Sequence, residues 1–466
     1  MEKIMECPSV FRVNDGKRNA RIIGSESILD QAMKTGAINQ LLNISELPGI
    51  VDLPVGMPDI HQGYGFPVGA VAAFRAEDGI VSPGGVGYDI NCGVTLMSTG
   101  MEIRELKGKT KEIMDSVWEN VPVGMKKSRF KPTTDDMSQI LEIGLGWAVD
   151  NGMATEDDQN MTEHSGTMKS AKWADVSQLA QDRGKNYLGT LGSGNHFMEF
   201  QYIDSTFEPE LTTKFRLEKG MAYVMIHSGS RGLGHQVAVD YIEKVKKEYP
   251  EQKVPDEQLR YAPLGSESAV SYISAMNAAA NYGFVNRQVM IHRIRQALGK
   301  VFKNTFDPVN ARLVYSISHN MATFENDLHG EKILVHRKGA TAAHGPGRAS
   351  GYYRETGHPV IIPGSMGARS YIMVGSQSEK DISFSSSCHG AGRSMSRKMA
   401  KETINHMKVI ENLEKKGISI KSDSEYSISE EAPESYKDIE EVKESMINSG
   451  ISRPVASMFP FFVLKG

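Results

Sequence analysis

The sequence is poor in cysteine and has no long apolar run, and each shortage excludes whole classes of protein. Its 466 residues include only three cysteines, at positions 7, 92 and 388, too few for a disulfide framework and typical of a reducing compartment. Nowhere do about 18 apolar residues follow one another, and the first residues lack the apolar stretch of a signal peptide. We therefore expect a cytoplasmic protein with no membrane partner.

A large excess of either charge is also lacking. The chain has 53 Lys and Arg against 57 Asp and Glu, a net charge of −4 at pH 7, so it offers no broad positive field to a nucleic acid. A nucleic-acid partner would have to bind through local groups of cations. The composition, 39% hydrophobic and 24% charged, is that of a folded protein and excludes wholesale disorder.

Short apolar runs with β character alternate with longer segments of helical periodicity. Strands are predicted at 69–74, at 93–99, at the start of 222–234, and in the later runs ARLVYSIS, KILV and HPVII. Helices are predicted at about 235–248, across 268–303, and in RSMSRKMAKETINHM, directly after HGAGR. Residues 101–185 indicate a peripheral helical excursion. We predict a mixed α/β, or α+β, fold: one large domain over residues 1–466, with several short sheets and long helices around a central site.

Several of the thirteen histidines stand at predicted strand ends, from which they can project into one cavity. His227 ends YVMIH, His319 ends LVYSISH, and His196 follows GTLGSGN, while Asp89 and Cys92 share the glycine-rich turn SPGGVGYDINCG. A thiolate with imidazoles suits Zn, Fe, Co or Mn, and the carboxylate admits a harder ion. Five ligands exceed one tetrahedral site, whereas two ions sharing the sulfur would use all five. The alternative is a buried apolar cysteine among hydrogen-bonded core histidines.

Two glycine-rich loops supply a second signal, since backbone N–H groups at turns bind phosphate oxygens. PGSMG at 363–367 lies between predicted strands, and HGAGR at 389–393 is predicted at the mouth of a helix. A neutral His389 there could attack a phosphate while the loop amides and Arg393 offset the developing charge. The alternatives are simple tight turns and a helix-capping histidine. Walker and GxGxxG loops are absent, and HSGSRG lacks the GxSxG pattern of serine hydrolases.

Taken together, these motifs resemble the long form of the RtcB-type RNA ligases over most of the chain. The strings that carry the resemblance, in order, are MPDIHQGYGFPVG, SPGGVGYDINCGV, LGTLGSGNHFMEF, HSGSRGLGH, SHNMA, HRKGAT, PGSMG, SSCHGAGR and the terminal LKG. Any one string is weak, but nine in this order are very unlikely to arise by chance.

The resemblance implies a dinuclear metal centre beside a GTP site. Two Mn²⁺ ions, with Zn²⁺ or Co²⁺ as alternative occupants, would share Cys92; Asp89 and His196 would complete one shell, and His227 and His319 the other. His389 would be the nucleophile that takes GMP from GTP. The GTP pocket would comprise Asn195, His196, Phe197, Met198, Glu199, His319, Asn320, Pro363, Gly364, Ser365, Met366, Ser370, His389, Gly390, Ala391, Gly392, Tyr436 and Lys465.

RNA phosphates would meet Arg231 and Arg397, and Lys338 as a further contact. The sequence departs from the family pattern directly after HRKGAT, where many relatives carry an arginine and this chain has Ala342, Ala343 and His344. The lost charge puts one RNA contact in doubt but leaves the nucleotide chemistry untouched.

The resemblance implies a GTP- and Mn²⁺-dependent RNA ligase. It would join 3′-phosphate or 2′,3′-cyclic phosphate ends to 5′-hydroxyl ends in tRNA splicing and RNA repair. Two alternatives stay open: a dinuclear metal phosphodiesterase that does not use GTP, and an inactive RNA-binding paralogue. Members of the long form often work with a small activator, archease, and we expect a monomer.

Overall fold

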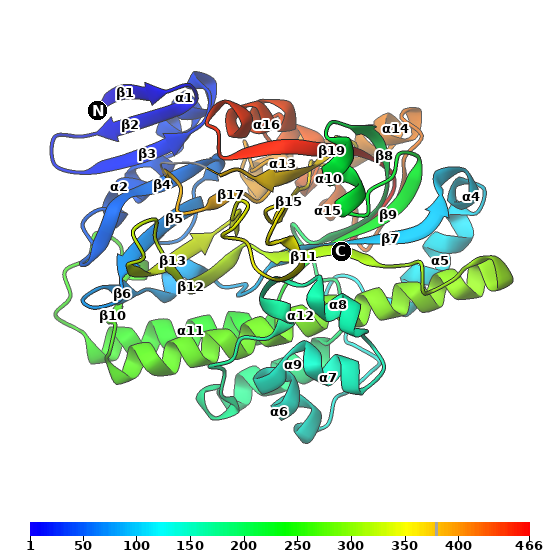
Figure 1. Ribbon diagram of the computed structural model, residues 1–466, viewed down its shortest axis with the longest axis horizontal. Helices are drawn as coiled ribbons and strands as arrows, with labels where there is room; N and C mark the ends of the chain where they lie inside the picture. The colour runs from blue at the N-terminus through cyan, green and yellow to red at the C-terminus, as the bar shows by residue number, and fades with distance from the viewer. Residues whose placement is uncertain (378–380) are drawn as a thin grey trace.

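A computed structural model of the chain describes residues 1–377 and 381–466 (Figure 1). Two large sheets dominate it. The first has the strand order β1 (Glu2–Cys7), β2 (Val10–Asn14), β3 (Asn19–Ile23), β4 (Ile50–His61), β5 (Val68–Arg75), β13 (Lys332–Lys338) and β12 (Asn320–Asn326). Only its β3–β4 pair is parallel among the described residues. Helices α1 (Glu26–Lys34) and α2 (Ala37–Ile44) pack against this sheet through a common apolar cluster.

The second sheet positions most of the candidate site. Its order is β11 (Leu313–Ser318), β7 (Gly93–Glu102), β9 (Met221–Ser228), β8 (Phe197–Thr206), β19 (Ser452–Lys465), β16 (Ser370–Gly375) and β15 (Pro359–Ile362), with β18 (Ser419–Ser422) parallel beside β19. Two small ladders join β6 (Ile80–Val81) to β10 (Ala262–Pro263) and β14 (Ala340–Ala342) to β17 (Ser386–Cys388).

The longest helix, α12 (Glu267–Phe302), runs along one side of the molecule next to α11 (Arg231–Glu248) (Figure 1). Ser266 caps it by accepting a hydrogen bond from the Ala269 N–H, and no proline interrupts its 36 residues. Small residues such as Ala278 let it pack closely, so most of its central turns are buried. The predicted helices 235–248 and 268–303 are both confirmed.

The remaining helices are short and surround the sheets. Those before α11 are α3 (Pro83–Val86), α4 (Ile103–Lys107), α5 (Thr110–Asn120), α6 (Thr134–Ile143), α7 (Leu145–Asp150), α8 (Glu156–Asn160), α9 (Gln178–Tyr187) and α10 (Pro209–Lys214). Those after α12 are α13 (Arg397–Thr403), α14 (His406–Lys415), α15 (Glu425–Glu430) and α16 (Ile439–Asn448). This mixture of helices and several sheets confirms the predicted fold class.

The segment 101–185 is mostly helical, and its α6, α7 and α9 lie beyond α12 in Figure 1. It also touches the second sheet. Thr162 forms a β-bridge with Ser316, and Glu163 accepts a hydrogen bond of 2.9 Å from the Ser318 N–H. The segment therefore supports β11, the strand that ends directly before His319.

One local prediction was wrong: HGAGR does not open a helix. Residues 389–396 form a loop after β17, and α13 begins only at Arg397, where Ser396 accepts a hydrogen bond from the Met399 N–H. The helix predicted in RSMSRKMAKETINHM is also broken, because Asn405 caps a second helix, α14. No helix in the described ranges is long and apolar enough to cross a membrane.

Candidate metal centre and nucleotide-binding residues

Strand order brings the predicted metal ligands together. β11, β7, β9 and β8 are neighbours in the second sheet, and adjacent strands lie about 4.8 Å apart. Gly93 is opposite both Ser318 and Ser228, and His227 is opposite Phe197. Cys92, His319 and His196 each lie one residue beyond these paired positions, so their side chains converge at one edge.

The ligand atoms form two groups that share one sulfur, and we call the five residues the metal cluster. Cys92 Sγ lies 3.4 Å from His196 Nε2 and 3.2 Å from His227 Nε2. His196 Nε2 is 2.8 Å from Asp89 Oδ2, and His227 Nε2 is 3.2 Å from His319 Nε2. The groups Asp89–Cys92–His196 and Cys92–His227–His319 each have ligand atoms within 4.8 Å of one another.

The chemistry of this donor set fits a divalent metal ion. Burial lowers the pKa of His227 and of His319 well below the usual value, which keeps both imidazoles neutral, the form that binds metal. Burial, reinforced by Asp89, also raises the pKa of the Cys92 thiol. A thiolate at this position therefore requires a cation to stabilise it. The buried donors suit one sulfur-bridged pair of ions.

Arg287 of α12, which our sequence reasoning did not select, holds the backbone next to two residues of the metal cluster. Its Nη1 donates to the Asn91 carbonyl at 2.7 Å and to the Ser228 carbonyl at 3.0 Å. These carbonyls adjoin Cys92 and His227, so one buried guanidinium holds two ligand-bearing segments at a set spacing.

His389 stands beside the metal cluster. Its ring centroid lies 4.7 Å from that of His319, and its Nδ1 lies 2.6 Å from Asp59 Oδ2. The same Asp59 oxygen accepts the His389 backbone N–H at 3.0 Å. Asp59 is fully buried in β4. Gly392 passes so close that a Cβ there would lie 2.3 Å from the Asp59 carbonyl oxygen, which requires glycine.

A second buried polar group, the Glu431 cluster, comprises Glu431, Arg393, Tyr436 and Lys465. Glu431 is within 3.3 Å of Lys465 Nζ and 3.1 Å of Arg393 Nη1, and it accepts a hydrogen bond from the Tyr436 hydroxyl. Burial alone would raise the pKa of Glu431, but Lys465 and Arg393 outweigh it and hold the pKa at about 2. Lys465 also lies 5.7 Å above the Phe197 ring, its β-ladder partner.

A hydrogen-bonded chain connects Glu199 to the PGSMG loop. Gln201 Nε2 donates to the Glu199 carboxyl and, at 3.1 Å, to Ser370 Oγ, which accepts the Gly364 N–H at 3.2 Å. Burial raises the pKa of Glu199 to about 7. Ser370 thus fixes the start of the loop, while Gln201 is a participant that our sequence reasoning missed.

The other residues assigned to the nucleotide site differ in which of their polar groups are free to bind a nucleotide. Asn320 Nδ2 donates to the Asp89 carbonyl at 3.0 Å and its Oδ1 accepts the Gly339 N–H at 2.9 Å, so its amide is already engaged. Asn195 is half-buried before β8. The side chains of Met198 and Met366 belong to apolar clusters. Half-buried or buried loop positions are Pro363, Gly364, Ser365, Gly390 and Ala391.

Comparison with known proteins identifies the family of this chain. The family model described as tRNA-splicing ligase RtcB matches residues 40–466. The tRNA-splicing ligase RtcB of Methanococcus maripaludis is 43% identical over 474 aligned positions, covering 100% of this chain and 98% of the relative. That of Nanoarchaeum equitans is 42% identical over 461 positions (97% and 96%), and that of Archaeoglobus fulgidus 43% over 446 (94% and 92%). The chain belongs to the tRNA-splicing ligase RtcB family.

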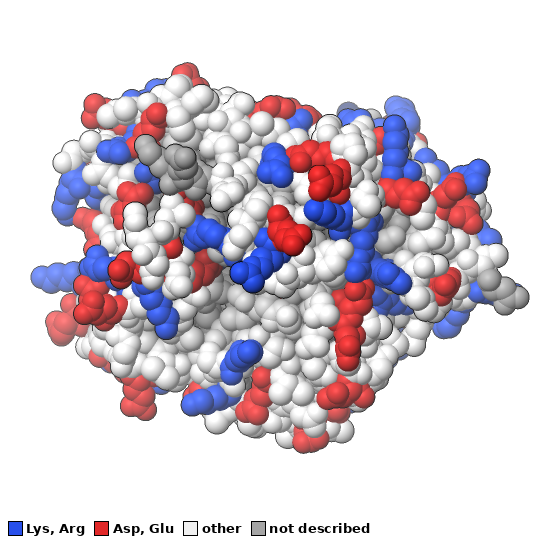
Figure 2. Space-filling view, viewed as in Figure 1, with Lys and Arg blue, Asp and Glu red and all other residues white. Residues whose placement is uncertain are grey.

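The residues assigned to RNA in this RtcB chain lie in unlike surroundings. Arg231 is half-buried with its Nη1 3.3 Å from His196 Nδ1, and Arg397 is half-exposed with its Nε 2.8 Å from Glu430. Lys338 is buried, donating to the Gly84 carbonyl at 3.0 Å and to that of Tyr64, and burial lowers its pKa to about 7. On the face shown in Figure 2, acidic and basic side chains are interspersed.

The segment in which a departure from the family pattern is predicted, Ala342 to His344, begins in a small ladder whose other strand ends directly before His389. Ala342 of β14 lies opposite Ser386 of β17, two residues before Cys388. Ala343 faces a separate cavity, and His344 Nε2 lies 3.4 Å from Glu325.

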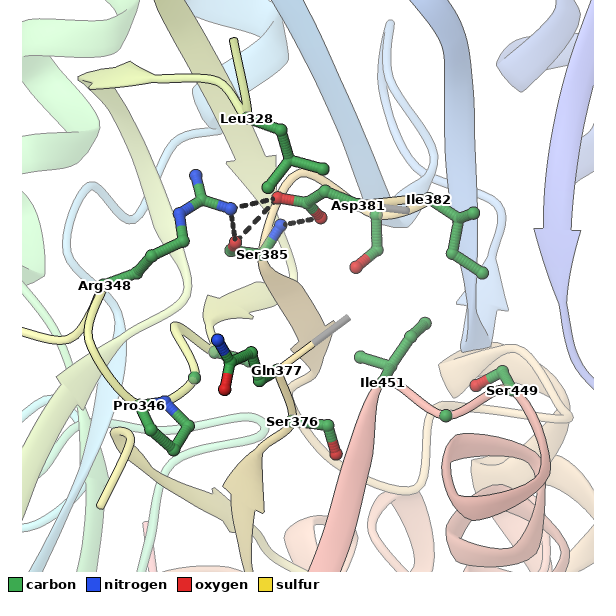
Figure 3. Close-up of a pocket in the computed structure, with 14 residues that line it drawn as sticks. Leu328, Pro346, Arg348, Ser376, Gln377, Asp381, Ile382, Ser385, Ser449 and Ile451 are labelled. Atoms are coloured by element: carbon green, nitrogen blue, oxygen red, sulfur yellow. Dashed lines mark hydrogen bonds and ion pairs between the residues drawn. The ribbon is translucent and has the colours of Figure 1, made fainter. Parts of the chain in front are cut away.

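That separate cavity, shown in Figure 3, is not the candidate site. Its volume is about 120 Å³, below the roughly 300–1,000 Å³ of typical ligand pockets. Arg348 points across it to Asp381, at 2.8 Å, and to Ser385 (Figure 3). Its charged groups are thus paired with one another, and none of the described residues that line it belongs to the metal cluster.

Proposed function

We propose that this RtcB-family RNA ligase joins RNA 3′-phosphate or 2′,3′-cyclic phosphate ends to 5′-hydroxyl ends, using GTP and two Mn²⁺ ions, in tRNA splicing and RNA repair. The observation that carries the proposal is the contact between a candidate nucleophile and a candidate metal cluster. The His389 ring packs on His319, whose Nε2 lies 3.2 Å from that of His227. Membership of the RtcB family supports the same reaction.

The metal ions would be held as the donor atoms suggest. Asp89, Cys92 and His196 would bind one, and Cys92, His227 and His319 the other. Bound divalent ions would act as Lewis acids on phosphate oxygens. Zn²⁺ and Co²⁺ also suit these ligands.

His389 is assigned the covalent step. The Asp59 carboxylate at its Nδ1 favours the tautomer with the proton on that atom, which leaves the Nε2 lone pair free. Nε2 attacks the α-phosphorus of GTP, forming an N–P bond while the bond to pyrophosphate breaks. The GMP then passes to an oxygen of the RNA 3′-phosphate as the N–P bond breaks.

Closure of the RNA follows on the activated end. The 5′-hydroxyl oxygen attacks the RNA 3′-phosphorus, GMP leaves, and the hydroxyl proton is released to solvent. A 2′,3′-cyclic phosphate would first be opened by water to a 3′-phosphate. The glycine-rich loops would offset charge on the phosphates through their N–H groups, and Phe197, Tyr436 and Lys465 would enclose the guanosine.

The experiment is to incubate the protein with Mn²⁺ and GTP labelled at the α-phosphate. We expect an acid-labile label on the wild type and on His406→Ala, a matched control on α14, and none on His389→Ala. Equal labelling of His389→Ala and wild type would refute the mechanism. Opening of cyclic ends without GTP and without His389 would favour the phosphodiesterase.

A ligation assay on RNA halves tests the remaining alternative, an inactive RNA-binding paralogue. We expect joined product with Mn²⁺ and GTP, with archease as an accelerating partner of a monomeric enzyme. Failure with every divalent ion tested, with and without archease, would favour the inactive paralogue.

A further inference from the structure

Three aromatic rings from distant parts of the sequence lie together at the surface beside the metal cluster. Tyr88 stacks on His235 with ring centroids 5.1 Å apart and planes 25° apart. Tyr64 meets Tyr88 edge to face at 6.2 Å. Tyr64 is 66% exposed, His235 is exposed, and Tyr88 is half-buried. We call these three residues the aromatic platform.

The aromatic platform adjoins the Asp89 end of the metal cluster. Tyr88 directly precedes Asp89 in the chain, and Ser230 Oγ, at the start of α11, lies 3.4 Å from Asp89 Oδ1. His235 lies on α11 four residues beyond Arg231, the residue at which that helix begins. Arg231 in turn contacts His196. A strand of RNA entering the metal cluster at this end would pass the platform.

The loops that carry Tyr64 and Tyr88 are fixed to one another, which gives buried Lys338 a role. Its ammonium donates to the carbonyl of Tyr64, in the first loop, and to that of Gly84, in α3, the short helix that precedes Tyr88. Both segments also abut Gln258, whose carbonyl would lie 2.7 Å from a Cβ on Gly65 and 1.8 Å from one on Gly84. The exposure of Tyr64 is therefore set by a rigid backbone, as a preorganised stacking surface requires.

We propose that the aromatic platform stacks the unpaired terminal base of the 5′-hydroxyl RNA strand. Unpaired bases bind on exposed aromatic rings with little regard to sequence. The geometry of phosphoryl transfer indicates which of the two RNA strands is stacked, because the attacking and leaving oxygens lie in line. The leaving GMP belongs to the His389 end of the site, so the attacking hydroxyl enters from the opposite end, where Asp89 and the platform lie.

This inference rests on the proposed function, and its test is built to separate the two. A hexaribonucleotide with a 5′-hydroxyl and 2-aminopurine as its first base reports stacking by fluorescence in the absence of GTP. We expect Tyr64→Ala and His235→Ala to weaken binding about tenfold and to reduce quenching. Tyr64→Phe should bind as wild type, because stacking requires the ring rather than the hydroxyl.

The controls keep the result specific. Tyr352→Ala removes another exposed tyrosine, 53% exposed, elsewhere on the surface and should leave binding unchanged. Tyr64→Ala should still take GMP from labelled GTP at the wild-type rate, because that step involves no RNA. In ligation, an abasic first nucleotide on the 5′-hydroxyl strand should raise KM about tenfold in wild type and much less in Tyr64→Ala.

Two outcomes would overturn the inference. One is a Tyr64→Ala affinity within about twofold of wild type, since a stacked base contributes more than that. The other is a KM effect that appears only when the abasic site is placed on the 3′-phosphate strand. If wild type binds the probe in a base-dependent way yet never becomes labelled by GTP, the proposed function fails instead.

Discussion

The metal cluster and the Glu431 cluster are both buried, yet they balance charge in opposite ways. In the Glu431 cluster, a carboxylate faces Lys465 and Arg393, so the protein supplies both signs. In the metal cluster, a thiol and three imidazoles face one another, and burial disfavours the charged form of Cys92, His227 and His319. The first pairs opposite charges by itself. In the second, burial opposes ionisation of Asp89 but the hydrogen bond from His196 outweighs it and lowers the pKa, so this carboxylate is charged before cations bind, whereas a charged Cys92 requires them.

Removing the charge of Glu431 should give the largest effect on stability. Glu431→Gln leaves Lys465 and Arg393 buried beside an amide, and we expect the free energy of unfolding to fall by about 3–5 kcal/mol. Chemical denaturation measures it. Glu430→Gln is the matched control, because its partners Arg397 and Lys401 are about half-exposed and the loss should stay under about 1 kcal/mol. Equal losses in the two variants would contradict the contrast between the clusters.

Added metal should stabilise the folded protein only by binding to the metal cluster. At a hundredfold excess over Kd, Mn²⁺ should raise the free energy of unfolding of the metal-free protein by about 2.7 kcal/mol for each ion bound. Cys92→Ser should lose most of this gain, since the sulfur serves both ions. Melting curves with and without Mn²⁺ provide the measurement, and Cys388→Ser, another buried cysteine, is the control. A full Mn²⁺ response in Cys92→Ser would show that the ions bind elsewhere.

Titration of Glu199 should make the stability of the protein depend on pH. The folded pKa of Glu199, about 7, lies above its usual 4.5, so its favourable contribution is complete below pH 4.5 and is lost as pH rises through 7. Between pH 5 and pH 8 wild type should therefore lose about 2 kcal/mol relative to Glu199→Gln. Urea titrations of both proteins across this range test it. Parallel pH profiles would mean that Glu199 titrates normally.

The smallest effect is expected at the two arginines assigned to RNA. Arg231→Ala, next to the metal cluster, should lower the slope of log affinity against log salt by about 1. Arg397→Ala should change it less, since Glu430 already pairs with that guanidinium. Filter binding at several salt concentrations measures both slopes. A larger change for Arg397→Ala would reverse the two assignments.

The parts of the fold that could be predicted from sequence follow strong local patterns. α12 carries apolar and small residues at helical spacing over ten turns, so its bounds were predicted within a residue of Glu267–Phe302. The metal-cluster histidines could be found because His227 and His319 each end an apolar run and His196 lies between a glycine-rich turn and the next apolar run. That those ends meet depends on strand order, which no local pattern encodes.

What could not be predicted depends on partners distant in the sequence. Asp59 lies within a quoted motif, but its role depends on His389, 330 residues away. Glu431 is one of many acidic residues in its segment and is distinguished only by Lys465 and Arg393. The error at HGAGR has a related cause, since Arg393 turns inward to Glu431 and the loop continues to Ser396 before a helix can start.

The hold of Arg287 on the carbonyls beside Cys92 and His227 has a consequence for exchange of the ions. Because that guanidinium projects from the buried middle of α12, the spacing of the two segments can change only if the long helix detaches. Backbone amides there should therefore exchange their hydrogens by global unfolding alone. After a chelator removes the ions, the metal cluster should keep its folded arrangement and bind new ions without refolding of the chain.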